Sequence, residues 1–341
     1  MTQETTTRSD PAGAEGRGAE DGRAEGRGAE GHRWAVILAG GDGKRLLPLT
    51  RRLSGDDRPK QFCKVLGAET LLDQTLHRIA RIVSPARTLI AVTKAHQHFY
   101  RDIGTAGLLV QPRNKGTNPA IAYSLVRLHE MDPRAVVAFF PSDHHFTNDE
   151  VFADCVRQAF DSAERYSNTV ILLGIAPNHP ETSYGWIEPG EQLMADGPGE
   201  VFVVRRFWEK PSSAVAIDLL RRGCFWNSFI MVGRVGSFLS LVEHAAPTLF
   251  RSFHAIAPTF FTHREEAGVL NLYLGIPPSS FSTDVLSVCA NRLAVFCNRA
   301  LEWADVGDVG RALSLRERAG PPPRKGAAVQ PEEIQVAAAA G

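Results

Sequence analysis

Short, almost uninterrupted apolar runs recur along the chain, and each has the length of a β-strand. The clearest are WAVILA at 34–39, TLIAVT at 88–93, AVVAFF at 135–140 and TVILLGIA at 169–176. Runs of this length, rich in branched side chains, are typical of strands buried on both faces of a sheet. We therefore predict a strand over each of these four ranges.

Between these runs, apolar residues recur at helical spacing. The three series are Leu72, Leu76, Ile79 and Val83, then Ile121, Leu125 and Leu128, then Phe152, Val156 and Phe160. Thr117 and Asn118 before Pro119 are typical of a helix start. Alternation of strands and helices over the first 175 residues predicts an α/β layer fold with a largely parallel sheet. Ligands of such sheets lie outside the carboxyl ends of the strands.

The two ends of the chain differ from this pattern. Residues 1–32 contain repeated GRGAE units with almost no large apolar side chain, so we expect a disordered, low-complexity tail there. Residues 321–341 begin with three prolines and are expected to form a loose second tail. The predicted catalytic domain therefore spans residues 33–320, and we expect no β-helix or fused isomerase domain after it.

Composition narrows the choice of partners and compartment. Lys plus Arg and Asp plus Glu both number 38, so no global charge indicates binding to nucleic acid or a membrane surface. Five cysteines without a Cys-x-x-Cys pair indicate reduced thiols in a cytoplasmic protein. No signal region or membrane-spanning run is present in the sequence. Whether the chain forms a homo-oligomer stays open.

The turn after the first apolar run combines glycine with positive charge. The segment AGGDGKR, residues 39–45, holds three glycines that allow unusual backbone dihedrals and close approach of an anion. It matches neither the dinucleotide fingerprint nor the P-loop. Lys44 and Arg45 could contact phosphate, and Lys60, shortly afterwards, could supply a second contact. A plain glycine turn with solvated cations is the alternative reading.

A second candidate site follows the run at 135–140. Asp143 stands at the predicted carboxyl end of that strand, where a carboxylate could hold a hard cation such as Mg²⁺. The alternative is that Asp143 caps the following helix. His144 and His145 lack a zinc-like pattern of partners, so we interpret them as orienting or surface residues.

An ordered series of motifs resembles one family. Gly-Gly-x-Gly-x-Arg-Leu-x-Pro-Leu-Thr at 40–50, followed by Pro-Lys-Gln-Phe at 59–62, is similar to the sugar-1-phosphate nucleotidyltransferases, most of all to their mannose-1-phosphate guanylyltransferase branch. The resemblance runs from about residue 34 to residue 310. It implies a Rossmann-like nucleotide-diphospho-sugar transferase fold, with a mostly parallel central sheet flanked by helices. It also implies Mg²⁺-assisted synthesis of GDP-mannose and pyrophosphate from GTP and mannose 1-phosphate.

The resemblance implies a role for each matching residue. The catalytic cations would be Arg45, Lys60 and Lys210. The nucleotide would contact Gly40, Gly41, Gly43, Lys44, Gln111 and Thr117. The sugar phosphate would contact Gly185, Glu209, Lys210 and Asn227. The metal ligands would be Asp143 and Asp305, and we expect no lysine or arginine to neutralise either carboxylate.

Several positions depart from the mannose branch. Gln111 stands where that branch tends to have glutamate, Ser183 and Phe229 stand where the family often has glycine, and Ser282 and Ser287 replace an aspartate and a glutamate. These departures bear on substrate identity rather than on the reaction class. A thymidylyl- or uridylyltransferase acting on glucose 1-phosphate and a non-catalytic nucleotide-sugar-binding regulatory protein stay open as alternatives.

Overall fold

The computed structural model describes residues 31–101, 103, 106–194 and 199–318. The C-terminal tail predicted at 321–341 and residues 1–30 of the predicted N-terminal tail lie outside this range. The chain divides into two units, Met1–His32 and Arg33–Gly341, and the second contains every element described below. No helix in the described ranges is long and apolar enough to cross a bilayer.

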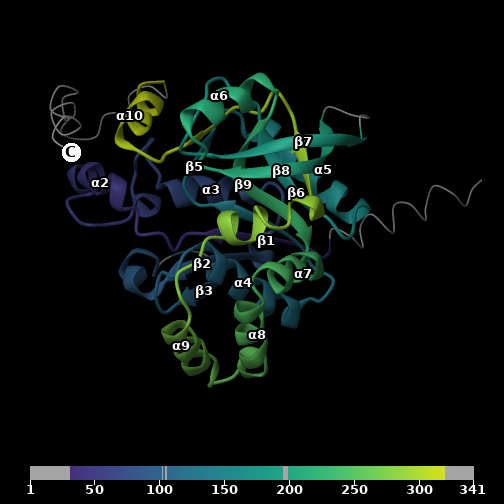
Figure 1. Ribbon diagram of the computed structural model, residues 1–341. Helices are drawn as coiled ribbons and strands as arrows, with labels where there is room; N and C mark the ends of the chain where they lie inside the picture. Colours follow the sequence, from purple (N-terminus) through teal and green to yellow (C-terminus); the bar gives the residue numbers. More distant parts are fainter. Residues whose placement is uncertain (1–30, 102, 104–105, 195–198, 319–341) are drawn as a thin grey trace, which may run out of the picture. The chain divides into compact units, whose positions relative to one another are not determined.

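A nine-stranded sheet forms the centre of this unit, in the order β3-β2-β1-β4-β9-β6-β10-β8-β7 as far as the structure describes the chain (Figure 1). Its parallel half consists of β1 (Arg33–Leu38), β2 (Thr88–Thr93), β3 (Gly107–Gln111) and β4 (Val136–Pro141). Strands β1, β2 and β4, together with β6 (Val170–Ile175), confirm the four strand predictions from the sequence, whereas β3 was not predicted.

The other half of the sheet is mostly antiparallel. Strand β9 (Phe225–Arg234) lies between β4 and β6 and runs antiparallel to both. Beyond β6 come β10 (Leu293–Cys297), parallel to β6, and the antiparallel pair β8 (Glu200–Glu209) and β7 (Gly185–Met194). The sheet is therefore mixed, and its parallel half is the part that the strand–helix alternation predicted.

Helices cover both faces, because successive residues of each central strand point to opposite sides. In β1, Val36 belongs to one core cluster, whereas Ala35 and Ile37 belong to the other. The first cluster packs against α4 (Thr117–Met131), α7 (Val235–Ala245), α8 (Pro247–Ile256) and α9 (Glu265–Gly275). The second packs against α3 (Leu71–Ile79), α5 (Asp149–Arg165) and α6 (Ser213–Arg221).

The predicted helices are confirmed with small differences at their ends. Helix α4 begins at Thr117, as expected. Helix α3 ends at Ile79, before Val83, and starts with a capping box formed by Thr70 and Asp73. The remaining helices are α2 (Leu47–Ser54) and α10 (Val309–Arg318). Short turns of 3₁₀ helix lie at Lys44–Leu46, Lys60–Phe62, Pro85–Arg87, Lys94–Phe99, Ala257–Thr259 and Ala290–Arg292, and one π turn at Ser282–Leu286.

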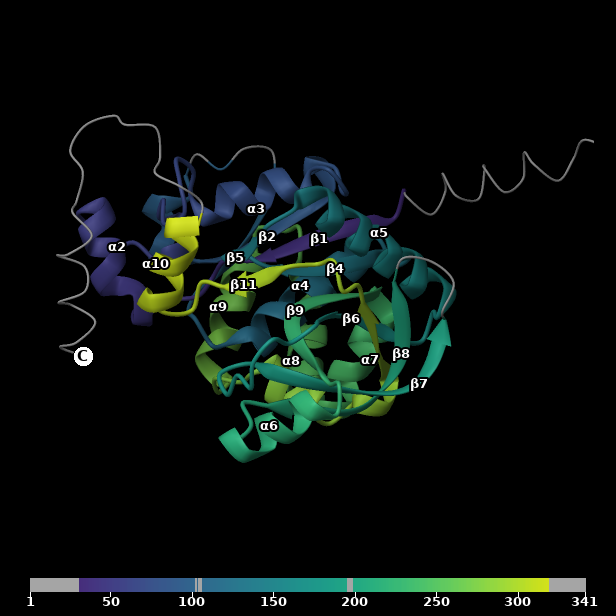
Figure 2. The ribbon, with the colours of Figure 1, turned by 90° about the horizontal axis from the view of Figure 1, so that it is seen from above.

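A separate two-stranded sheet lies beyond the end of β4 (Figure 2). Strand β5 (His144–Phe146) pairs antiparallel with β11 (Trp303–Asp305), with Asp305 opposite His144. Two segments far apart in the sequence are thereby placed side by side, and each carries one of the predicted metal ligands at or next to its end.

Candidate functional site

The glycine turn after β1 is held in shape by Gln61, a buried residue of the Pro-Lys-Gln-Phe segment. Its side-chain amide donates hydrogen bonds to the carbonyl oxygens of Ala39 (2.9 Å) and Gly41 (2.8 Å). Gly43 has a φ of 62°, and a Cβ there would stand 3.0 Å from the backbone nitrogen of Lys60. Glycine is therefore required at this position, both by its conformation and by the close approach of the second segment. The turn is fixed in shape by the protein itself.

The side chains of two cations at the end of the turn have no polar partner in the described part of the chain. Lys44 and Arg45 are exposed, and neither forms a hydrogen bond or ion pair with another described residue. Arg45 lies close enough to Lys60 for its charge to oppose protonation of that ammonium. Unpaired cations beside a rigid glycine turn suit a polyanionic ligand.

Gln111 and Thr117, predicted nucleotide contacts, lie on the same edge of the sheet. Gln111 ends β3 and is buried, and its amide nitrogen stands 2.8 Å from where a Cβ of Gly40 would be. Its amide oxygen accepts a hydrogen bond from the hydroxyl of Tyr273 at 3.2 Å. The hydroxyl of Thr117 accepts one from the backbone nitrogen of Phe281 at 2.9 Å. The Thr117 side chain thus stabilises the segment at Phe281. The backbone at the start of α4, rather than the hydroxyl, is therefore what Thr117 contributes to an anion site.

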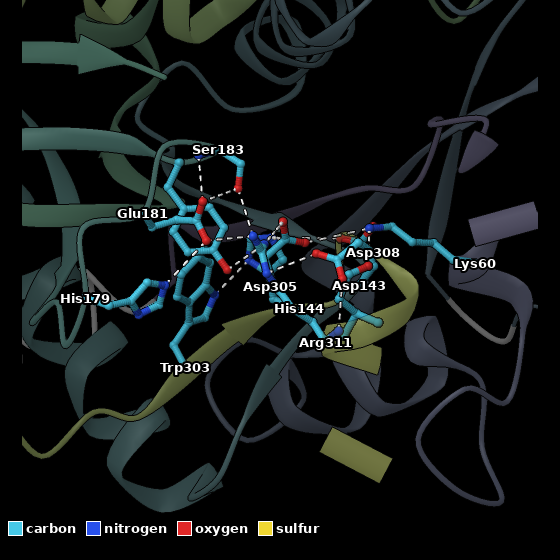
Figure 3. Close-up of polar contacts among 12 residues, drawn as sticks. Lys60, Asp143, His144, His179, Glu181, Ser183, Trp303, Asp305, Asp308 and Arg311 are labelled. Carbon is cyan, nitrogen blue, oxygen red and sulfur yellow. Dashed lines mark hydrogen bonds and ion pairs between the residues drawn. The ribbon is translucent and has the colours of Figure 1, made fainter. Parts of the chain in front are cut away.

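The two predicted metal ligands share one lysine. The Lys60 ammonium lies 2.9 Å from Oδ2 of Asp143 and 3.7 Å from Oδ1 of Asp305, and it donates a hydrogen bond to the carbonyl of Val306 at 2.7 Å (Figure 3). Both carboxylates thus lie beside the same ammonium, and that they hold one metal ion stays a prediction. The prediction that no cation neutralises them is wrong, because two half-buried carboxylates this close attract a neighbouring ammonium.

The charges of this group shift one another's pKa values. Burial alone would lower the pKa of Lys60, but the two carboxylates raise it above its usual value. Burial alone would raise the pKa of Asp143, but the Lys60 charge and hydrogen bond, together with the neighbouring His144, hold that pKa low. Lys60 and Asp143 are therefore both charged near neutral pH.

His144 faces the same carboxylates, as an orienting residue would. The indole nitrogen of Trp303 donates a hydrogen bond to Nδ1 of His144 at 3.0 Å. The proton of the neutral ring is therefore assigned to Nε2, which lies 4.0 Å from Oδ1 of Asp143 and 4.0 Å from Oδ1 of Asp305. Burial lowers the pKa of His144, which favours that neutral form.

The donor set fits a magnesium ion that also binds substrate phosphates. Mg²⁺ is commonly held by one or two carboxylates, with phosphates and waters completing its coordination. Asp143 and Asp305 provide two, and the described residues contain no cluster of three or more protein donors. The alternative role of Asp143 as a helix cap is not observed, because Asn148 caps α5 through the backbone nitrogens of Glu150 and Val151.

The predicted sugar-side residues also come together. Gly185 pairs with Glu209 across β7 and β8, and a Cβ on Gly185 would stand 3.1 Å from Glu209 Oε2 and 3.4 Å from the Cβ of Asn227. Burial raises the pKa of Glu209, although the nearby Lys210 charge partly opposes this. The Lys210 ammonium is mostly exposed and lies 3.9 Å from Glu209 Oε1. A mostly exposed ammonium thus lies beside a glycine, a carboxylate and an amide.

One departure from the family pattern has a visible backbone consequence. Phe229 has a φ of 59°, in the left-handed region that glycine adopts at least cost. Its backbone nitrogen donates to Oδ1 of Asn227 at 3.1 Å, which occupies one acceptor of that amide. Phe229 therefore holds a backbone conformation that glycine would adopt at less cost.

Sequence reasoning missed Arg311, which joins the carboxylates to the sugar-side loop. Its guanidinium contacts Glu181 and Ser183 on one side and Asp305 on the other (Figure 3). The only local signal was an ion pair with Asp308 at helical spacing, which is common on solvated helices. The structure thus forms one chain of contacts from the glycine turn through Lys60, the carboxylates and Arg311 to the sugar-side loop.

Comparisons with known proteins identify the family. The nucleotidyl transferase family model matches residues 34–316. A mannose-1-phosphate guanylyltransferase of Sinorhizobium fredii is 32% identical over 288 residues, which cover 80% of this chain and 52% of the relative. One of Salmonella typhimurium is 30% identical over 291 residues, covering 80% of this chain and 57% of the relative. The chain thus spans little more than half the length of these curated relatives.

A solved structure is similar over a larger share of its length. The crystal structure of a mannose-1-phosphate geranyltransferase from Thermus thermophilus shares 30% sequence identity, with a TM-score of 0.69. The match covers 81% of this chain and 76% of that one. These similarities confirm the resemblance and the fold that were predicted from the motifs.

Proposed function

Because this chain belongs to the nucleotidyl transferase family, we propose that it transfers GMP from GTP to mannose 1-phosphate, forming GDP-mannose and pyrophosphate. The observation that carries this proposal is the shared contact of Asp143 and Asp305 with Lys60. It supports a cation site between the glycine turn, which suits a triphosphate, and the loop that bears Gly185. The branch-specific motifs and the names of the relatives favour guanine and mannose.

The reaction needs positioning and charge neutralisation more than proton transfer. The phosphate oxygen of mannose 1-phosphate is already an anion, so it attacks the α-phosphorus of GTP without a general base, and pyrophosphate leaves. The glycine turn with Lys44 and Arg45 holds the triphosphate, and Lys210 orients the attacking phosphate. Glu209 and Asn227 hydrogen-bond the sugar hydroxyls.

A magnesium ion held by Asp143 and Asp305 would neutralise the phosphates of both substrates. With the carboxylates so engaged, the Lys60 ammonium would be available to the leaving pyrophosphate beside Arg45. His144, whose Nε2 faces Oδ1 of each carboxylate, helps to orient them. Gln111 contacts the base, and the start of α4 at Thr117 lies toward the phosphates.

The remaining proposals concern setting and organisation. We infer a cytoplasmic enzyme, supported by five buried cysteines, none of them in a disulfide. The catalytic domain spans residues 33–320 between two tails that take no part in turnover. A homo-oligomer is compatible with the proposed chemistry, which uses residues of one chain only.

A substrate matrix tests the proposal. GTP, dTTP, UTP and ATP are each paired with mannose 1-phosphate and glucose 1-phosphate, and pyrophosphate release is measured. GTP with mannose 1-phosphate is expected to give the highest kcat/KM. A higher value for dTTP or UTP with glucose 1-phosphate, which Gln111 would favour, would mean that the substrates are wrong and the reaction class right. No release with any pair, together with tight nucleotide-sugar binding, would support a regulatory protein instead.

A further inference from the structure

Each nitrogen of the Arg311 guanidinium has a polar neighbour. One terminal nitrogen donates to Glu181 Oε2 (2.7 Å) and to the hydroxyl of Ser183 (2.9 Å). The other donates to the hydroxyl of Tyr184 at 2.9 Å and lies 3.7 Å from Oδ2 of Asp305. Nε pairs with Asp308 at 3.1 Å. A planar fork with five donors can hold this many groups at once, whereas a lysine cannot.

The two oxygens of Asp305 have different neighbours as a result. Oδ2 faces Arg311, and Oδ1 faces Lys60 and His144 on the side of Asp143. A Cβ on Gly307 would stand 2.4 Å from Oδ2, so only glycine leaves room for this rotamer. Arg311 and Gly307 therefore fix the rotation that aims Oδ1 toward the other carboxylate.

Ser183 is the partner of Arg311 in the sugar-side loop. Its hydroxyl accepts from Arg311 and donates to Glu181 Oε1 at 2.8 Å, and its backbone nitrogen donates to the same oxygen at 2.8 Å. A glycine, which the family often has here, would lack the hydroxyl. The loop is therefore tied to the helix by a side chain that departs from the family pattern.

Packing holds α10 without help from this network. Val306 and Ala312 are buried in a small cluster with Leu46, Leu49, Cys63, Val65, Leu66 and Leu71. Because this apolar cluster anchors the segment on both sides of the arginine, replacing the guanidinium leaves the attachment of α10 in place.

We propose that Arg311 is a positioning residue that fastens the loop Glu181–Tyr184 to Asp305, and so sets the affinity for the sugar 1-phosphate. The proposal rests on the proposed function. Tyr184 directly precedes Gly185, and its backbone carbonyl accepts a hydrogen bond from the backbone nitrogen of Lys210 at 3.2 Å. The position of the loop is therefore transmitted to both sugar-side residues. The nucleotide side has no such contact with Arg311 in the described chain.

The test compares Arg311→Met, Arg311→Lys and a matched control, Arg316→Met. Arg316 lies on the same helix and makes no hydrogen bond or ion pair with another described residue. For Arg311→Met the KM of mannose 1-phosphate should rise about tenfold, the usual size for losing a charged hydrogen bond, while the KM of GTP stays within about twofold. Arg311→Lys should not restore it, because the charge is kept but the fork is lost. The control should match the wild type.

Hydrogen exchange gives a readout that does not depend on turnover. Amides of residues 181–185 should exchange about tenfold faster in Arg311→Met and in Arg311→Lys, with β1 and β4 unchanged. Unchanged exchange in the loop, rescue by lysine, or an equal rise in both KM values would overturn the proposal. Should Arg311→Met not fold, Ser183→Gly removes one contact of the same network and must show the same direction in both readouts. If the wild type releases no pyrophosphate from GTP and mannose 1-phosphate, the proposed function fails while the exchange result still decides the loop contact.

Discussion

The ammonium of Lys60 occupies the space between two carboxylates that the proposed mechanism assigns to a divalent cation. Two partly buried like charges repel each other, so without metal the lysine stabilises the folded chain by neutralising them. With metal bound, the same ammonium would face an added positive charge and would be free to serve the phosphates. In the proposed mechanism, one residue thereby couples cation binding to phosphate contact.

We expect Lys60→Met to lower the Tm measured without divalent ions, because Asp143 and Asp305 lose their shared partner. Mg²⁺ should then raise the Tm of the variant by more than it raises that of the wild type, since no ammonium competes for the site. Thermal denaturation with and without Mg²⁺ measures both effects. An equal Mg²⁺ shift in the two proteins would mean that lysine and metal do not compete.

Lys210 and Arg45 should separate the two substrates. Lys210→Ala should mainly weaken the use of mannose 1-phosphate, because the mostly exposed ammonium of Lys210 lies beside Glu209. Arg45→Ala should mainly weaken the use of GTP, because the arginine follows the glycine turn. Each loss should be about ten- to a hundredfold in kcat/KM, which corresponds to roughly 1.5–3 kcal/mol for a charged hydrogen bond. Equal losses for both substrates in both variants would contradict these roles.

Among the secondary-structure elements, the small sheet of β5 and β11 is the one that positions the two carboxylates of the site. Its register sets Asp305 opposite His144, next to Asp143, so backbone pairing brings the two carboxylates together. Elements of this kind are short, with three residues in each strand, and neither has a distinctive hydrophobic pattern. Their effect comes from where they pair.

Asp143→Asn and Asp305→Asn should each abolish most turnover while the fold, measured by circular dichroism, is kept. The double variant should be scarcely slower than either single one, because the loss of one ligand already disables a shared ion. Single-turnover kinetics at saturating Mg²⁺ provide the comparison. Multiplying losses would show that the carboxylates act on separate groups.

The sequence predicted the features that neighbouring residues determine. The runs at 88–93 and 135–140 and the start of α4 at Thr117 were recognisable because periodicity and capping are properties of neighbouring residues. The insertion of β9 between β4 and β6 was not, because the pairing joins segments far apart in the chain. Asp143 and Asp305 belong to recognisable motifs. Arg311 does not, and its contacts join segments far apart in the chain, so the sequence did not identify it.

At the scale of the whole molecule, one contiguous unit carries every contact of the site, from Gly40 to Arg311. Its first strand begins at Arg33, whose guanidinium pairs with Asp161 and Glu164 on α5. This unit thus has a charged contact at its first strand residue, so a shortened chain must retain Arg33.

A chain that begins at residue 31 should keep both the fold and the turnover of the full chain. The repeats before it contain almost no residues that could join a core, so their removal costs no buried apolar surface. Thermal denaturation and the pyrophosphate assay on both chains test this. A marked loss in either measurement would assign the repeats a role in folding or catalysis.

The pairing of β5 with β11 also bears on when, during synthesis, the proposed cation site can form. Trp303 and His144 are 159 residues apart, so the first carboxylate emerges long before the second. A nascent chain that ends before β9 lacks the strand between β4 and β6 and also lacks Asp305. Closing so long a loop is entropically costly. A chain that holds the ion as proposed would therefore acquire that affinity only after β11 has paired with β5.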